Sequence, residues 1–141
     1  MKHLKNFILV ASIVFLPKIA NAKVVELSER QLFEKVCRGY DYTYKGDKPC
    51  VLLFHNGTCP FAKQIDRFLE KLSKKKEYKN KIYFYKVNVW RVSDKTLEDF
   101  ELEGVPTTFF FRTDGNIDYD LGMLDVEDLE RQLKWLLRRW Y

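Results

Sequence analysis

An apolar segment that runs through a polar turn into an amphipathic helix constrains the fold of this chain more than any other feature. The four residues 51–54 are all apolar, as is typical of a strand buried on both faces. After the turn comes Cys59, and Pro60 suits the first turn of a helix. Helical spacing then predicts a buried stripe of Phe61, Ile65, Phe68, Leu69 and Leu72. The pattern therefore predicts a buried strand that turns sharply into a helix, with Cys59 where the helix begins.

The rest of the chain alternates strand-like and helix-like segments. Strands are predicted at 23–27, 51–54, 82–89, 107–112 and 117–119, and helices are predicted to start near Ser28, Cys59, Ser93 and Asp125. Early strands separated by helices favour parallel pairing through crossovers. The last two strands are joined by a tight Asp114-Gly115 turn and must be antiparallel. We therefore expect an α/β fold of order β-α-β-α-β-α-β-β-α, with helices on both faces of a mixed sheet.

The first 22 residues have the pattern of a secretory signal peptide. Lys2 and Lys5 precede an apolar run over 7–16, and Ala20-Asn21-Ala22 supplies a small-x-small cleavage pattern. An uncleaved membrane anchor is the alternative, but the run is shorter than the roughly 20 residues that span a bilayer. We expect cleavage after Ala22, a bacterial-type periplasmic location, a mature domain over 23–141 and no stable membrane insertion.

Charge and composition argue against several classes of partner. The formal net charge is +5, and three of the lysines, Lys2, Lys5 and Lys18, lie in the predicted signal peptide. The charge that remains gives no case for nucleic-acid binding. His55 is the one histidine after residue 22, and with scattered cysteines it makes no metal-ligand pattern, so neither a metal nor a cofactor is predicted. Nothing in the pattern indicates an oligomeric state.

The chain has three cysteines, so at least one thiol is unpaired within a monomer. Cys50 begins the strand that ends before Cys59, and extended chain puts roughly 25 Å between their Cα atoms. A disulfide allows at most about 7 Å. Cys37, late in the first helix, is also predicted at the far end of the sheet. Cys37 and Cys50 therefore form either a disulfide with each other or two small buried thiols, and neither reaches Cys59.

The region around Cys59 resembles the active site of the thioredoxin family, where an apolar strand leads to Trp-Cys-x-x-Cys-Lys at the start of a helix. The matching stretch here runs from Lys48 to Lys63. Two later stretches also match. The first, Gly104-Val105-Pro106-Thr107, looks like the family's cis-proline turn, and the second is Phe109-Phe110-Phe111 followed by Asp114-Gly115 and then Gly122. The resemblance covers about residues 24–140. It implies a thioredoxin-like three-layer α/β/α fold, with the Val105–Pro106 bond cis and lying against Cys59.

The departures from the family pattern fall on its chemistry. The second cysteine of the family corresponds to Ala62, its buried general-base aspartate to Leu53 and the tryptophan before its first cysteine to Thr58. A dithiol cycle needs the second thiolate to release the substrate, and Ala62 cannot supply one. We therefore expect an exported monothiol protein that acts in thiol–disulfide exchange and redox homeostasis through Cys59. It would be an oxidoreductase without a resolving cysteine, with protein or small-molecule thiols and disulfides as its partners.

The resemblance also suggests which residues surround Cys59. The rim that would hold an extended substrate consists of Thr58, Pro60, Phe61, Val105 and Pro106. Lys86 matches a buried lysine of the family. With Leu53 in place of the acid, Lys86 is expected to lack a carboxylate partner, so it either favours the Cys59 thiolate or reaches out to solvent. His55 is either a catalytic partner of Cys59 or a strand-end residue packed on the turn.

A second function from a different class fits the same residues. The chain would then be a redox-silent binding module that docks an extended peptide beside Pro106, with Cys59 as a relic. The two hypotheses differ in whether Cys59 forms mixed disulfides.

Overall fold

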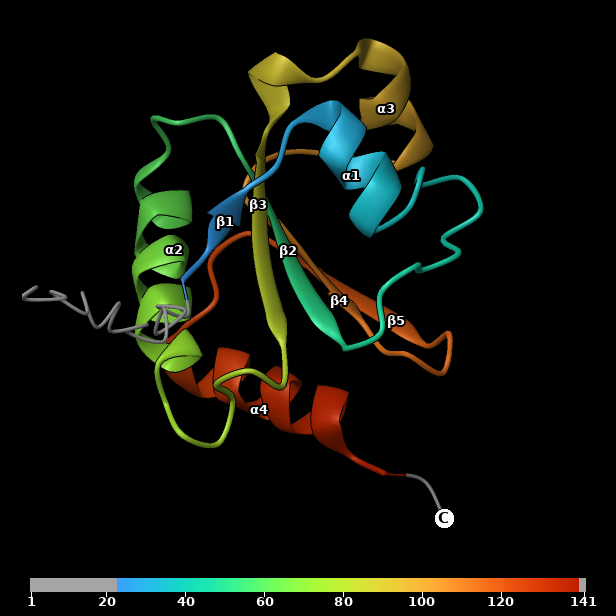
Figure 1. Cartoon of the computed structure of the whole chain (residues 1–141). Helices are drawn as coiled ribbons and strands as arrows, with labels where there is room; N and C mark the ends of the chain where they lie inside the picture. The colour runs from blue at the N-terminus through green and yellow to red at the C-terminus, as the bar shows by residue number, and fades with distance from the viewer. Residues whose placement is uncertain (1–22, 140–141) are drawn as a thin grey trace, which may run out of the picture.

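A mixed five-stranded sheet, in the order β1-β3-β2-β4-β5, forms the centre of the domain (Figure 1). The computed structural model describes residues 23–139, so the predicted signal peptide lies outside the described residues. The strands are β1 (Val25–Glu26), β2 (Cys50–His55), β3 (Tyr83–Asn88), β4 (Thr107–Phe111) and β5 (Ile117–Leu121). β1 and β2 run parallel to β3, whereas β4 is antiparallel to β2 and to β5. This is the mixed sheet that the alternation of strands and helices predicts.

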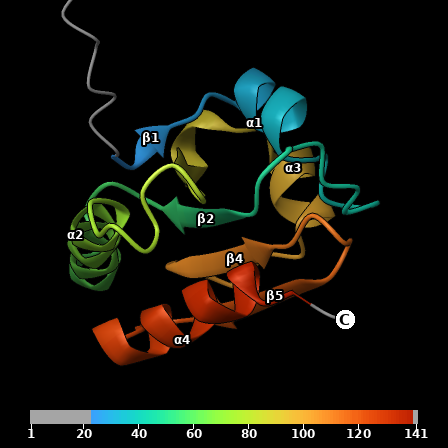
Figure 2. The same cartoon turned by 60° about the horizontal axis from the view of Figure 1, so that its bottom comes forward.

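Helices cover both faces of the sheet. They are α1 (Glu29–Lys35), α2 (Pro60–Ser73), α3 (Asp94–Asp99) and α4 (Val126–Leu137), with a 3-10 turn, η1 (Val89–Arg91), between β3 and α3. Figure 2 shows α1 and α3 on one face and α2 and α4 on the other. The expected three-layer α/β/α architecture and element order are confirmed. Within the described residues, no helix combines the length and apolar character needed to cross a membrane.

Side-chain caps begin three of these helices at the positions that the sequence predicts. Ser28 and Gln31 form a capping box at α1, Ser93 accepts a hydrogen bond from the third residue of α3, and Asp125 does the same for α4. Each cap supplies an acceptor to backbone N–H groups that have no partner inside the helix. The start of α2 differs and is described with the site below.

The central strand β2 belongs to two separate cores. Val51 and Leu53 face α2 and α4, whereas Leu52 and Phe54 face α1 and α3, and all four side chains are fully buried. Alternation along a strand sends successive side chains to opposite faces of a sheet. The prediction that this run is buried on both faces is therefore confirmed, and the run ties the two helix layers together.

Phe61 does not belong to the buried stripe of α2, so that part of the prediction is wrong. Its side chain is 56% exposed, while Ala62, Ile65, Leu69 and Leu72 are buried. Successive residues of a helix are about 100° apart around its axis. A stripe that includes Ala62 therefore turns Phe61 away from the sheet.

Replacement of Phe54 by Asp is expected to unfold the domain. The Phe54 ring lies 5.0 Å from the ring of Phe100 and 5.8 Å from that of Phe109, centroid to centroid. A carboxylate there has no partner and is expected to cost about 4 kcal/mol or more of unfolding free energy. Urea denaturation measures this, with Phe61→Asp as the matched control at an exposed position. Equal stability of the two variants would contradict the packing of β2.

Candidate functional site

Cys59 is the N-cap of α2, just beyond the carboxyl end of β2. Its backbone is extended, its side chain is partly buried, and its sulfur makes no capping hydrogen bond to the helix. Pro60, which has no N–H group, occupies the first helical position. The sulfur is therefore placed beside the first-turn N–H groups and the positive end of the helix dipole.

A hydrogen-bonded turn around Asn56 connects β2 to Cys59. The Asn56 Oδ1 atom accepts hydrogen bonds from the N–H groups of Thr58, at 3.0 Å, and Cys59, at 2.8 Å. It also accepts one from the Thr58 hydroxyl at 3.3 Å. Gly57 has φ +82°, a left-handed conformation that favours glycine. Asn56 was not among the predicted site residues, although an Asn-Gly pair after a strand is a turn signal.

His55 packs on this turn with both of its ring nitrogens engaged. Nδ1 accepts the N–H of Gly57 at 3.0 Å, and Nε2 lies 3.1 Å from both carboxylate oxygens of Glu26. Because a backbone N–H can only donate, Nδ1 is the acceptor and the ring proton lies on Nε2, facing Glu26. The geometry matches the strand-end alternative for His55, in which the ring supports the turn before Cys59.

Lys86 has a carboxylate partner, so the expectation that it would lack one is wrong. Its Nζ atom lies 2.7 Å from Oδ2 of Asp66, and both side chains are about three-quarters buried. Lys86 is the register partner of Leu53 and points to the same face of the sheet, toward α2. Asp66 reaches it from α2 rather than from β2. The prediction took a carboxylate partner to be possible only at position 53, on β2. The sequence signal for the partner is Asp66, which lies four residues after Ala62 on the same side of α2.

These groups share one cavity of about 190 Å³. Its lining combines side chains from β2 and β3 with the first two turns of α2, namely Leu53, His55, Gly57, Cys59, Ala62, Lys63, Asp66 and Lys86. Ala62 lies between Cys59 and Asp66, one helical turn from each. The cavity therefore brings together a thiol, a carboxylate and two ammonium groups.

The predicted rim residues lie at the same end of the sheet as Cys59. Thr58 and Pro60 are exposed along with Phe61, while Val105 is partly buried and Pro106 is buried. The Val105–Pro106 bond is cis, as the resemblance predicts. The pairing of Phe54 with Thr107 brings the end of β2 beside the start of β4. Contact between Pro106 and the Cys59 sulfur stays a prediction.

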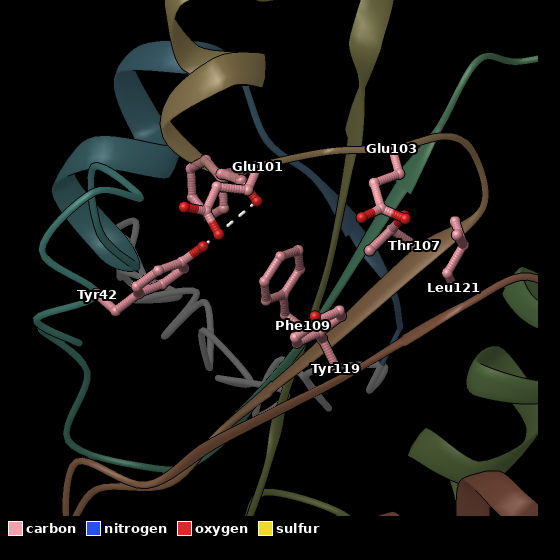
Figure 3. Close-up of a pocket in the computed structure, with 8 residues that line it drawn as sticks. Tyr42, Glu101, Glu103, Thr107, Phe109, Tyr119 and Leu121 are labelled. Carbon is pink, nitrogen blue, oxygen red and sulfur yellow. Dashed lines mark hydrogen bonds between the residues drawn. The ribbon is translucent and has the colours of Figure 1, made fainter.

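A second, smaller cavity of about 70 Å³ lies over β4 and β5 on the α3 side (Figure 3). Its walls are mainly aromatic, since Phe109 stacks on Tyr119 and Tyr42, and the Tyr42 hydroxyl donates to the carbonyl of Phe100. Glu101 and Glu103 stand at its edge in Figure 3. None of its lining residues also lines the Cys59 cavity, so it is separate from the thiol.

Comparison with known proteins agrees with this architecture. A model of the thioredoxin-like domain matches residues 41–136. This chain belongs to the thioredoxin-like domain family. A thioredoxin of Borreliella burgdorferi is 30% identical to it over 116 residues, which cover 78% of this chain and 94% of that protein.

Solved structures show the same fold. Chloroplastic thioredoxin z has a TM-score of 0.66 at 17% identity, with 81% of this chain and 94% of that chain covered. The thioredoxin of Malassezia sympodialis has a TM-score of 0.63 at 25% identity, with 81% of this chain and 90% of that chain covered. The fold expectation is therefore confirmed.

In this thioredoxin-like protein, Cys37 and Cys50 are free thiols buried in the core that faces α1 and α3. Burial raises the pKa of Cys37 from its usual 9.0 to about 11, and burial raises the pKa of Cys50 as well. Both lie away from the Cys59 cavity. In the structure both cysteines are buried free thiols, and a disulfide between them stays a prediction that chemical mapping can test.

Among residues 23–139, no group of three His, Cys, Asp or Glu side chains is placed to hold a metal ion.

Alkylation of the folded protein near pH 7.5 is expected to label Cys59 and to leave Cys37 and Cys50 unlabelled until urea unfolds the chain. Peptide mass mapping identifies which cysteines are alkylated. Two thiols that stay unlabelled after unfolding without reductant would instead reveal a disulfide.

The buried Cys37 thiol also predicts a dependence of stability on pH. Between about pH 9 and pH 11 the unfolded state loses a Cys37 proton that the folded state keeps, so the unfolding free energy is expected to fall as the pH rises. Urea denaturation at pH 8 and pH 10 measures this fall, and Cys37→Ala is the control in which the contribution of Cys37 is absent.

Proposed function

We propose that this chain is a monothiol thiol–disulfide exchange protein that acts through Cys59. The observation that carries the proposal is the placement of Cys59 at the start of α2, with an uncapped sulfur that opens onto a cavity. Helix N-termini favour the thiolate, which is the nucleophile in disulfide exchange. The family relationship supports thiols and disulfides as substrates.

The absence of a second nearby thiol supports a single-cysteine mechanism. Ala62 stands one turn beyond Cys59, where the family places its second cysteine, and it lines the same cavity. Cys50 begins β2, at the opposite end from Cys59, and Cys37 lies in the same buried cluster as Cys50. Neither can attack a disulfide formed on Cys59 within one molecule.

The proposed reaction is a single exchange step. The Cys59 thiolate attacks one sulfur of a partner disulfide, and a bond forms between Cys59 and that sulfur. The partner's own disulfide bond breaks, and its second sulfur leaves as a thiolate that takes a proton from water. The product is a mixed disulfide on Cys59, which lasts until an outside thiol attacks it.

The surface around Cys59 supports docking of a partner. Phe61 is 56% exposed and Trp90, in the 3-10 turn η1 that follows β3, is 79% exposed, while Val105 is partly buried beside Pro106. An exposed apolar side chain such as Phe61, two residues after Cys59 at the start of α2, is available to contact a partner. We propose that Thr58, Pro60, Phe61, Val105 and Pro106 contact the partner chain while its disulfide is under attack.

Mixed disulfides are expected to accumulate on Cys59 and to disappear in Cys59→Ser. Without an internal second thiol, the adduct persists until an external thiol arrives. Ala62→Cys is expected to shorten its lifetime at least tenfold, because an intramolecular thiol has a large effective concentration. Non-reducing electrophoresis after acid trapping measures the adducts, with Cys37→Ala as the matched cysteine control.

The same experiment separates the redox proposal from a redox-silent binding module. A binding module keeps its partners in Cys59→Ser and loses them when Val105 is enlarged beside Pro106. Unchanged partner binding in Cys59→Ser, with no adduct in the native chain, would contradict the exchange function.

We further propose that residues 1–22 direct export and are removed, which places the protein in the bacterial periplasm. The basic start, the apolar run and the Ala20-Asn21-Ala22 pattern support this proposal. The exported protein is expected to begin at Lys23, which N-terminal sequencing of a periplasmic fraction measures. Replacement of Ala22 by Arg is expected to block processing, whereas a full-length chain in the cytoplasm would contradict export.

A further inference from the structure

We propose that the cavity between Cys59 and Asp66 binds a small thiol that carries a carboxylate, a molecule of the cysteine class, and that this thiol performs the release step. In this assignment Asp66 takes the proton of the incoming thiol and Lys63 holds its carboxylate. The inference rests on the proposed function, because it concerns the fate of the Cys59 mixed disulfide.

The position of the cavity fits an incoming sulfur. Exchange requires the attacking, central and leaving sulfurs to lie roughly in line. The cavity of about 190 Å³ adjoins Cys59 on the side of Ala62, whose methyl group fills little space. This volume exceeds the roughly 30 Å³ share of one water molecule several times, so an amino-acid-sized thiol has room there. A thiol in this space sits one helical turn from Cys59.

Asp66 supplies a proton acceptor in the same cavity. Its Oδ2 atom is bound to Lys86 at 2.7 Å, whereas its Oδ1 atom is buried and has no hydrogen-bond partner among the described residues. A buried, unpaired carboxylate oxygen is costly and calls for a partner. Because no solvent reaches Oδ1 in this structure, the Asp66 carboxylate, which lines the cavity, must turn toward it to accept the S–H group of a thiol above Ala62. Lys86 holds the Asp66 side chain in place through its contact with Oδ2.

Lys63 explains why the thiol should carry a carboxylate. It lines the cavity one turn from Cys59, its side chain is exposed, and no ion pair involves it within residues 23–139. Lys86 is already paired with Asp66, and His55 is held by Glu26 and Gly57. Lys63 is therefore the cation of this cavity that remains for a ligand anion.

The release step balances as a thiol–disulfide exchange. The S–H proton of the small thiol passes to the Asp66 carboxylate, and the resulting thiolate attacks the Cys59 sulfur. The bond between Cys59 and the partner breaks, and the partner sulfur leaves as a thiolate that takes the proton back from Asp66. Cys59 then carries the small thiol in a new mixed disulfide, and the partner leaves as a free thiol. The number of disulfide bonds does not change.

The test uses the purified protein with a thionitrobenzoate group on Cys59, formed by reaction with Ellman's reagent. Cys59→Ser serves as the blank for other thiols. Formation of this adduct reports the proposed function, and its discharge by added thiol, followed by absorbance, reports the inference. The discharge rate is expected to saturate with cysteine concentration, because the thiol binds before it reacts. Cysteamine, which lacks only the carboxylate of cysteine, is expected to discharge the adduct at least fivefold more slowly at low concentration.

Asp66→Asn is expected to slow discharge by cysteine at least tenfold at pH 7 while adduct formation changes less than twofold. Its rate should also rise about tenfold per pH unit between pH 6 and 8, as the thiolate fraction of free cysteine does, whereas the native rate should change little. The other titratable groups at the cavity, Cys59, Lys63, Lys86 and His55, are the same in both proteins. Asp99→Asn, which removes the carboxylate of the Lys95 ion pair on α3, is the matched control and should match the native protein.

Two results would overturn the inference and leave the exchange function standing. One is a discharge rate that rises linearly with cysteine concentration and is equal for cysteamine. The other is an Asp66→Asn variant that forms and discharges the adduct like Asp99→Asn. A thermal melt of each variant distinguishes loss of the site from loss of the fold. Lys63→Gln, at an exposed position, should lose the preference for cysteine over cysteamine without a change in melting temperature. Failure to form any adduct on Cys59 would instead contradict the proposed function itself.

Discussion

Burial of β2 on both faces is the constraint on which the rest of the structure depends. Its residues 51–54 pack against two helix layers at once, so the strand cannot shift by one residue without reversing both cores. The Asn56 turn follows directly after this strand, and its hydrogen bond to the Cys59 N–H holds Cys59 at the start of α2. The position of Cys59 is therefore set by the apolar packing of β2 and by the Asn56 turn, and not by a capping hydrogen bond of its own sulfur.

The charged groups near Cys59 show how a polar pair can be kept in place when one strand position becomes apolar. Leu53 completes the core against α2 and α4, and its register neighbour Lys86 would be unpaired if only β2 supplied partners. Asp66 provides the carboxylate from the facing helix instead. A partly buried ammonium group needs an acceptor, but the acceptor can come from any element that reaches it. The ion pair thus links α2 to β3 directly beside the cavity.

Local patterns in the sequence predicted the fold well, whereas contacts between elements decided what could not be predicted. The apolar run at 51–54, the cap at Ser28 and the turn at Asp114-Gly115 each depend on neighbours in the chain, and each appears where expected. The exposure of Phe61 and the pairing of Lys86 depend on how α2 is rotated against the sheet. A stripe of apolar residues fixes that rotation only to within about one position, since Phe61 and Ala62 both continue it at helical spacing.

If Cys59 performs the proposed exchange, a single thiol changes the kinetics of the reaction more than its chemistry. With cysteine at position 62, the attacking sulfur would be held one helical turn from Cys59, and release would be unimolecular. With Ala62, the same attack must come from a separate molecule, so the lifetime of an adduct follows the concentration of that molecule. The small-thiol site proposed above would recover part of that effective concentration. It would also make release depend on the concentration of small thiol around the protein.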